Sequence, residues 1–163
     1  MFLTFFPLES YYKIRLEMRS YMNWGYGLNQ TDNGPNPYVA NIEQQAVQNQ
    51  NFRTAIWTGC HLQMTLMCIP PCGEVGLEIH PDTDQFIRVE QGNAVVGMGR
   101  WEYQMDFQRN MCRGDAVFIP AGTWHNVVNV GTRPLKLSVI YAPPHHPRGT
   151  VHRTKSDAER AGY

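Results

Sequence analysis

The chain has 163 residues, and its 14 lysines plus arginines equal its 14 aspartates plus glutamates, so the formal net charge is zero. A chain of this length suits one domain that buries a core without disulfide support. The charge balance gives no electrostatic basis for binding nucleic acid or an anionic membrane, so we expect neither as a partner.

The N-terminal residues 1–8 are apolar and aromatic, but no basic residue precedes them and Pro7 interrupts them. A signal peptide needs a cationic start and a longer apolar run, and a membrane helix needs about 20 apolar residues. Neither pattern is present, and we expect a cytoplasmic protein. Met18 and Met22 are alternative starts, so residues 1–21 are a mis-called extension, a flexible tail or an added strand or helix.

Residues 22–38 are rich in Asn, Gly, Pro and aromatic side chains, a composition typical of irregular structure. We therefore expect an N-terminal arm over residues 1–38, which either packs on the domain or a partner subunit or acts as a lid. Asn41 is followed three residues later by Gln44, which predicts a capped short helix over residues 42–49.

Short apolar runs separated by turn residues follow this helix. The expected strands cover residues 52–58, 61–69, 86–90, 94–98, 104–111, 116–119, 126–130 and 135–141. Strands at this spacing predict an all-β domain, a jelly roll or small barrel, over residues 39–147. The polar tail of residues 148–163 contains one further predicted helix, over residues 154–161.

The four cysteines, Cys60, Cys68, Cys72 and Cys112, show no paired CxxC spacing. A zinc knuckle or a thioredoxin-like site is therefore not expected. Their apolar surroundings favour reduced, buried thiols in a cytosolic protein, although the spacing leaves a disulfide open.

The most informative motif consists of five residues at fixed intervals: Gly114, Pro120, Gly122, His125 and Asn129. In this pattern an apolar strand enters a Pro and Gly turn, and the next strand carries one histidine that offers a neutral imidazole nitrogen. The motif resembles the second motif of the cupin superfamily. The resemblance implies a cupin jelly-roll barrel in which this histidine binds a metal.

A first cupin motif, altered, lies upstream. The family pattern has two histidines separated by one residue, then a glutamate, then a glycine. Counting back from Gly92, the glutamate position holds Gln85 and the histidine positions hold Glu78 and His80. The leading glycine is displaced as well, because Cys72 occupies its position and the glycine follows one residue later.

The resemblance therefore implies a metal site with four candidate ligands: Glu78, His80, Gln85 and His125. Residues two apart on a strand point to the same face, as Glu78 and His80 must to share a metal. An amide oxygen is a weak donor, so Gln85 either ligates or orients a water or substrate. The alternative is that these histidines are ordinary hydrogen-bonded strand residues.

This donor set suits one divalent transition metal, Mn²⁺, Fe²⁺, Ni²⁺ or Zn²⁺, and is poor for Cu(I). The chain is most similar to small single-domain bacterial type-2 cupins, often called phosphomannose-isomerase-like. We place first a metal-dependent, isomerase-like enzyme on a small carbohydrate or hydroxy-carbonyl compound. An Fe(II) dioxygenase-type cupin and a non-catalytic ligand-binding or assembly module stay open, and the sequence names no catalytic residue outside the metal shell.

Other residues carry secondary expectations. If Glu78 and His80 face inward, Leu77 and Ile79 face outward and need a cover, which favours a homodimer. His145 and His146 lie in a proline-rich turn and are expected to be structural or solvent-facing rather than ligands. Arg88 alternates away from Gln85 and is not expected to bind a phosphate in the cavity.

Overall fold

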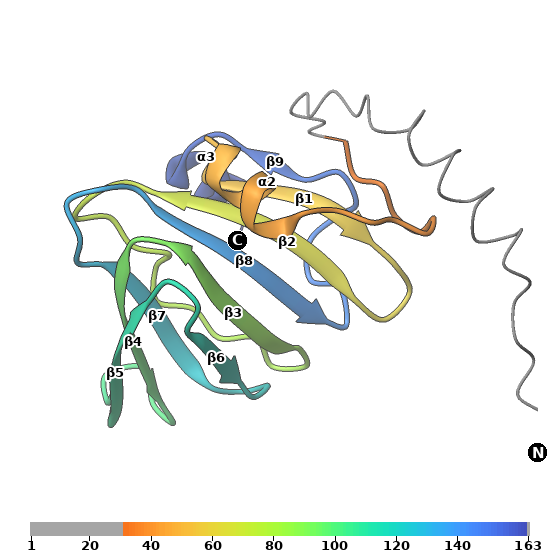
Figure 1. The fold of residues 1–163 in the computed structure, drawn as a ribbon. Coiled ribbons are helices and arrows are strands. Elements are labelled where there is room, and N and C mark those ends of the chain that lie inside the picture. Colours follow the sequence, from red (N-terminus) through yellow and green to blue (C-terminus); the bar gives the residue numbers. More distant parts are fainter. Residues whose placement is uncertain (1–30, 163) are drawn as a thin grey trace, which may run out of the picture.

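Two antiparallel sheets form the part of the chain that the computed structural model describes, residues 31–162 (Figure 1). The elements in order are α2 (Ile42–Gln48), β1 (Arg53–Thr58), β2 (Gln63–Ile69), β3 (Asp84–Gln91), β4 (Asn93–Gly99), β5 (Phe107–Cys112), β6 (Ala116–Ile119), β7 (Trp124–Asn129), β8 (Leu135–Ala142), β9 (Val151–His152) and α3 (Lys155–Arg160). The expected all-β jelly roll is confirmed. The expectations for residues 1–30 lie outside the described residues.

The larger sheet has six strands in the order β6-β3-β8-β2-β1-β9, and the smaller sheet has the order β5-β4-β7. The segment before β3 extends the smaller sheet, because Glu74 bridges Val128 and Glu78 bridges His125 on β7. The candidate ligands Glu78 and His80 thus lie on an extended segment beside β7, where a strand was anticipated.

The core lies between the two sheets and follows from the period-two alternation of their strands. On β8, Leu137, Val139 and Tyr141 are fully buried and face the interior. They belong to a cluster that also includes Val96 of β4 and Val127 of β7. Apolar side chains from both sheets therefore fill most of the space between them.

Helix α2 covers the outer face of the larger sheet, where Ala46 packs with Ile56 and Leu66. The helix begins as predicted, because the Asn41 side chain accepts a hydrogen bond of 3.0 Å from the Gln44 backbone N–H. This cap satisfies one of the free N–H groups in the first turn.

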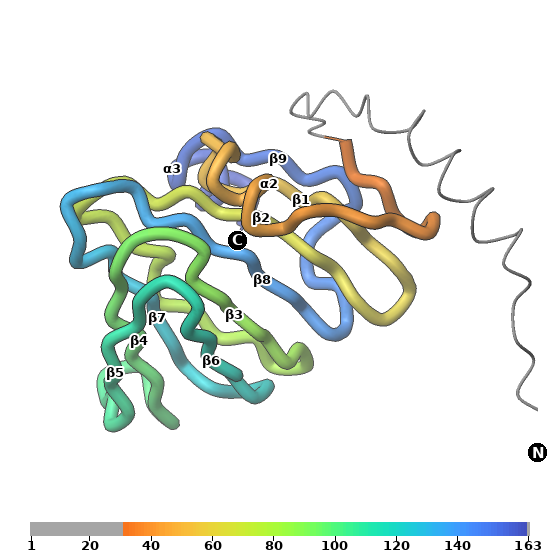
Figure 2. The backbone as a smooth tube through the Cα atoms, viewed as in Figure 1, coloured from red at the N-terminus to blue at the C-terminus, as the bar shows by residue number. Residues whose placement is uncertain are grey.

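The C-terminal residues pack onto the same sheet, as the chain path in Figure 2 shows. Strand β9 pairs with β1, and α3 begins at Thr154 with a capping box, so the predicted helix is confirmed. Ala158 of α3 is 2% exposed and belongs to the main core. The eight predicted strands are confirmed apart from shifts at their ends, whereas β9 was not predicted.

The cysteines correct one expectation. All four thiols are free, but Cys60, Cys72 and Cys112 are exposed and Cys68 is half-buried. The prediction of buried thiols was wrong, because three of the cysteines lie in turns or at a strand end.

Outward-facing apolar side chains are present, as expected for Leu77, which is 42% exposed, and also at Phe118, which is 74% exposed. A homodimer that covers such residues stays a prediction. Within residues 31–162, no helix has both the length and the apolar character needed to span a membrane.

Candidate metal centre

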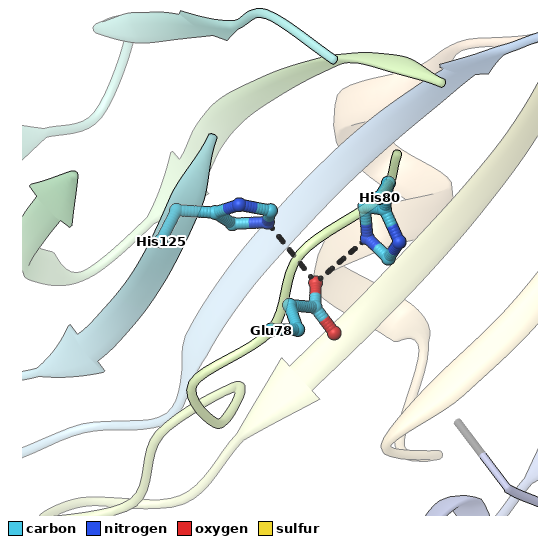
Figure 3. Close-up of side chains that lie close together, drawn as sticks. All are labelled: Glu78, His80 and His125. Carbon is cyan, nitrogen blue, oxygen red and sulfur yellow. Dashed lines mark hydrogen bonds and ion pairs between the residues drawn. The ribbon is translucent and has the colours of Figure 1, made fainter. Parts of the chain in front are cut away.

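Three of the predicted ligands converge inside the fold: Glu78, His80 and His125 (Figure 3). Their potential ligand atoms all lie within 4.8 Å of one another. His80 is 5% exposed and His125 is 1% exposed. The Glu78 side chain is 18% exposed and points between the two rings.

Backbone hydrogen bonds hold this group together. The N–H of Glu78 donates to the carbonyl of His125 and the N–H of His125 donates to the carbonyl of Glu78, both at 3.0 Å. Such a reciprocal pair places the two residues directly opposite each other. The Gly122 N–H also donates to the His80 carbonyl at 2.8 Å, so the turn of the second motif is bound to the first motif.

The tautomer of His125 is set by its surroundings. Its Nδ1 lies 2.8 Å from the carbonyl oxygen of Thr123, which only accepts, so Nδ1 donates. In the neutral ring, Nε2 then carries a lone pair, and it faces Glu78 Oε1 at 3.3 Å. Two acceptors thus face each other, an arrangement that a cation between them stabilises.

His80 completes the arrangement. Its Nε2 lies 3.2 Å from the same oxygen of Glu78, and its buried Nδ1 has no hydrogen-bond partner among the described residues. A histidine that ligates a metal through one nitrogen commonly donates the other N–H to a carbonyl, as His125 does here. The donors therefore fit a divalent metal ion.

The electrostatics keep Glu78 ionised. Burial by itself raises the pKa of this carboxyl group, but the adjoining His125 and His80 and the positive charge of Arg53 lower it by more. The pKa of Glu78 is therefore well below its usual range. An anionic oxygen is the strongest donor to a divalent cation in this set.

The fourth predicted ligand, Gln85, lies on β3 opposite Tyr141 of β8 and is 3% exposed. Its Oε1 is buried and has no hydrogen-bond partner among the described residues. An unsatisfied buried amide oxygen suits a donor to a cation or a water, and its ligand role stays a prediction. Arg88 points to the opposite face, as expected, where it pairs with Glu90 at 2.6 Å.

His145 and His146 were expected to be structural or solvent-facing rather than ligands, and neither belongs to the group of potential ligands found among the described residues. The His145 ring centroid lies 4.2 Å from that of His80, so a half-buried imidazole adjoins the metal centre. His146 is 4% exposed, and its ring packs edge-to-face on that of Tyr141.

Gln63 of β2 holds this loop in place. Its Nε2 donates to the His146 carbonyl at 2.8 Å, and its Oε1 accepts from the His146 N–H at 2.9 Å. The two residues are 83 positions apart, so no local sequence signal pointed to His145.

Burial, together with the neighbouring His80, lowers the pKa of His145 to about 4. The imidazole of His145 is therefore neutral at pH 7 and able to accept a proton. Burial raises the pKa of Tyr141, which keeps its hydroxyl protonated. The centre thus combines a cation site with one neutral base and one neutral hydroxyl.

The displaced glycine of the first motif is explained by the backbone. Cys72 has a φ of 60°, a left-handed conformation that glycine adopts without strain. Cys72 therefore occupies the position of the motif glycine, which supports the register in which Glu78 and His80 take the histidine positions.

Asn129, the last residue of the second motif, has a structural role. Its side-chain N–H groups reach the carbonyls of Ile69, Pro70 and Arg133 at 2.9 to 3.0 Å, and its Oδ1 accepts from the Gly131 N–H. One buried amide thus joins β7 to the end of β2 and to the turn that follows β7.

Comparison with known proteins agrees with this geometry. Residues 65–141 match the family model described as Cupin domain. The chain is 55% identical over 130 residues to the uncharacterized protein YrkC of Bacillus subtilis, covering 80% of this chain and 70% of YrkC. It is 39% identical over 115 residues to the uncharacterized protein L612 of Acanthamoeba polyphaga mimivirus, covering 70% of each.

The crystal structure of BH2720 from Bacillus halodurans superposes with a TM-score of 0.79 at 55% identity, covering 80% of this chain and 98% of that one. The chain therefore belongs to the cupin family. Within that family its first motif carries Glu78 where the usual pattern has a histidine, and Gln85 where the usual pattern has a glutamate.

Proposed function

We propose that this chain is a metal-dependent enzyme that moves a proton between neighbouring carbons of a small hydroxy-carbonyl compound, as an isomerase of small carbohydrates does. The observation that carries the proposal is the meeting of the lone pair of His125 Nε2 with the anionic Glu78 Oε1, 3.3 Å apart. A divalent cation between these two acceptors, with His80 beside them, would relieve their repulsion.

A divalent Mn²⁺, Fe²⁺, Ni²⁺ or Zn²⁺ held by Glu78, His80 and His125, with Gln85 as the proposed fourth donor, would polarise a substrate carbonyl. His145, whose ring lies beside His80, is the base that we assign to the proton transfer. The protonated ring then returns the proton to the second carbon, which completes the transfer. The protonated hydroxyl of Tyr141 is a donor for a substrate oxygen.

One observation favours a second candidate. Two imidazoles and one carboxylate are also the donor set of non-haem Fe(II) oxygenases. An Fe(II) dioxygenase would use the same three residues, and oxygen consumption distinguishes it from the isomerase.

The test begins with metal analysis of protein purified without an affinity tag, followed by loading with each of the four metals. We expect close to one divalent metal per chain. Isomerase chemistry is then measured by proton NMR in D₂O, as deuterium entering glyceraldehyde or dihydroxyacetone at the carbon next to the carbonyl. His145→Gln should abolish this exchange and keep the metal, whereas the matched change at an exposed histidine, His61→Gln, should leave the exchange unchanged.

Each outcome decides between the candidates. Metal content near zero, without uptake of any of the four ions, overturns the metal centre. Bound metal with oxygen consumption and no exchange selects the dioxygenase. Bound metal with neither reaction over a screen of sugars and sugar phosphates selects a non-catalytic ligand-binding module.

A further inference from the structure

Arg53 of β1 is a buried charge that makes no direct ion pair with a carboxylate among the described residues. It faces the interior, in register with Met67 of β2 and His152 of β9, and is 1% exposed. Its Nε and Nη1 are buried without a hydrogen-bond partner among residues 31–162. A guanidinium stays protonated in proteins, so this charge cannot be removed by deprotonation.

A buried charge without a partner is strongly unfavourable, and buried polar groups left unsatisfied in a native fold need an explanation. Contact with the Phe52 ring, 5.4 Å from the guanidinium carbon, compensates only part of this cost. Glu78 acts on Arg53 only through its field, since its Oε1 meets the two histidines.

A cavity of about 220 Å³ is lined by both Arg53 and Glu78, one of the candidate ligands. Lys155 and Glu74 lie on its wall and pair with each other at 2.8 Å, so their charges cancel. Glu159 is exposed to solvent, which screens its charge. The two interior charges, Arg53 and Glu78, sum to zero, and a bound divalent cation leaves the interior with two positive charges.

We propose that Arg53 binds the carboxylate of a small hydroxy-oxo acid, which has a hydroxyl and a carbonyl on the neighbouring carbons C2 and C3, and that such acids are the substrate class of this centre. The inference rests on the proposed function, because the metal supplies the excess positive charge and the hydroxyl and carbonyl of the acid are the groups to be acted on. The carboxylate gives the guanidinium the charged hydrogen-bond partner that it lacks. The cavity is smaller than the roughly 300–1,000 Å³ typical of drug-sized ligands, which restricts the acid to a few heavy atoms.

Glycolate and glycolamide test the proposal, because they have the same heavy-atom skeleton and differ in charge. Both are titrated by isothermal calorimetry into metal-loaded protein. We expect wild type to bind glycolate at least about tenfold more tightly than glycolamide, since losing one partner of a buried charged pair has an effect of this order or larger. Arg53→Met should lose this preference and keep its metal, and Arg53→Lys should retain part of it.

Arg100→Met is the matched control, because Arg100 is exposed on the loop after β4. It should bind glycolate as wild type does. Equal glycolate affinity in wild type and Arg53→Met, or equal affinity of wild type for glycolate and glycolamide, overturns the proposal. Should circular dichroism show that Arg53→Met does not fold, Arg53→Lys and the two-ligand comparison in wild type decide.

Repeating the titrations with chelated protein separates this inference from the proposed function. Protein that takes up no metal but binds glycolate in an Arg53-dependent way rejects the metal centre and retains the carboxylate site. Protein that binds one metal per chain and shows no Arg53-dependent preference for glycolate retains the metal centre and rejects the carboxylate site. Inorganic phosphate is the third probe, and phosphate that binds more tightly than glycolate through Arg53 overturns the choice of a carboxylate.

Discussion

His146 should make the fold sensitive to mild acid. Burial, together with Arg53 and His145, lowers the pKa of this imidazole to about 2. In the unfolded chain the reference pKa of histidine is about 6.5. As the pH falls below 6.5, the unfolded chain binds a proton at His146 and the folded chain does not, so acid favours unfolding.

The magnitude follows from these two values. Protonation stabilises the unfolded chain through His146 by about 2 kcal/mol at pH 5 and by about 0.2 kcal/mol at pH 7. The free energy of unfolding should therefore fall by about 2 kcal/mol between pH 7 and pH 5 through this one residue. Carboxylates with lowered pKa values, such as Glu78, lose their contribution only at lower pH, outside this window.

Urea denaturation of the chelated protein at several pH values from 5 to 7 measures this slope. His146→Gln keeps a neutral polar side chain and cannot titrate, so its stability should fall by about 2 kcal/mol less than that of wild type. His145 and His152, whose pKa values burial also lowers, contribute equally to both proteins. Exposed His61→Gln is the control and should follow wild type. Parallel pH profiles for wild type and His146→Gln would refute the reasoning.

Three further predictions concern the two motifs. Glu78→Gln should weaken metal binding far more than Gln85→Ala, and Gln85→Glu should bind as well as wild type or better, because an anionic oxygen exceeds a neutral amide as a donor; equal metal titrations of wild type and Glu78→Gln would place Glu78 outside the shell. Asn129→Ala should lower the free energy of unfolding by about 3 kcal/mol, since three carbonyls and one N–H lose their partner; a loss below about 1 kcal/mol in urea denaturation would contradict this. Cys72→Gly should raise the free energy of unfolding by about 1 kcal/mol, because glycine adopts the left-handed backbone of this exposed position without strain. In thermal unfolding, an unchanged or lower midpoint would mean that the turn bears no strain.

The shared face of Glu78 and His80 follows from local rules, whereas their meeting with His125, 47 residues after Glu78, was predicted from the resemblance to the two cupin motifs. The period-two alternation places Glu78 and His80 on one face, and the Pro and Gly turn sets where His125 begins its strand. The cap at Asn41 was predictable from local rules as well, since residues within one turn of a helix interact. These parts of the fold required only spacing and residue type.

The surroundings of the centre depend on contacts between distant segments. His145 reaches His80 because Gln63 binds the His146 backbone, and a proline-rich turn does not show in which direction it leaves a strand. In the sequence Arg53 is an ordinary strand residue, and its position becomes evident only from its pairing with the distant strand β9. The cysteines were predicted to be buried from their apolar neighbours, but a turn exposes a side chain whatever its neighbours are.

The reciprocal backbone hydrogen bonds between Glu78 and His125 separate the position of a donor from its chemical identity. Main-chain atoms alone set the distance between these two positions, so a carboxylate can replace an imidazole at residue 78 without moving residue 125. The sheet acts as a fixed frame with exchangeable donors. A donor set held in this way can be changed by single substitutions, and the barrel around it need not adapt.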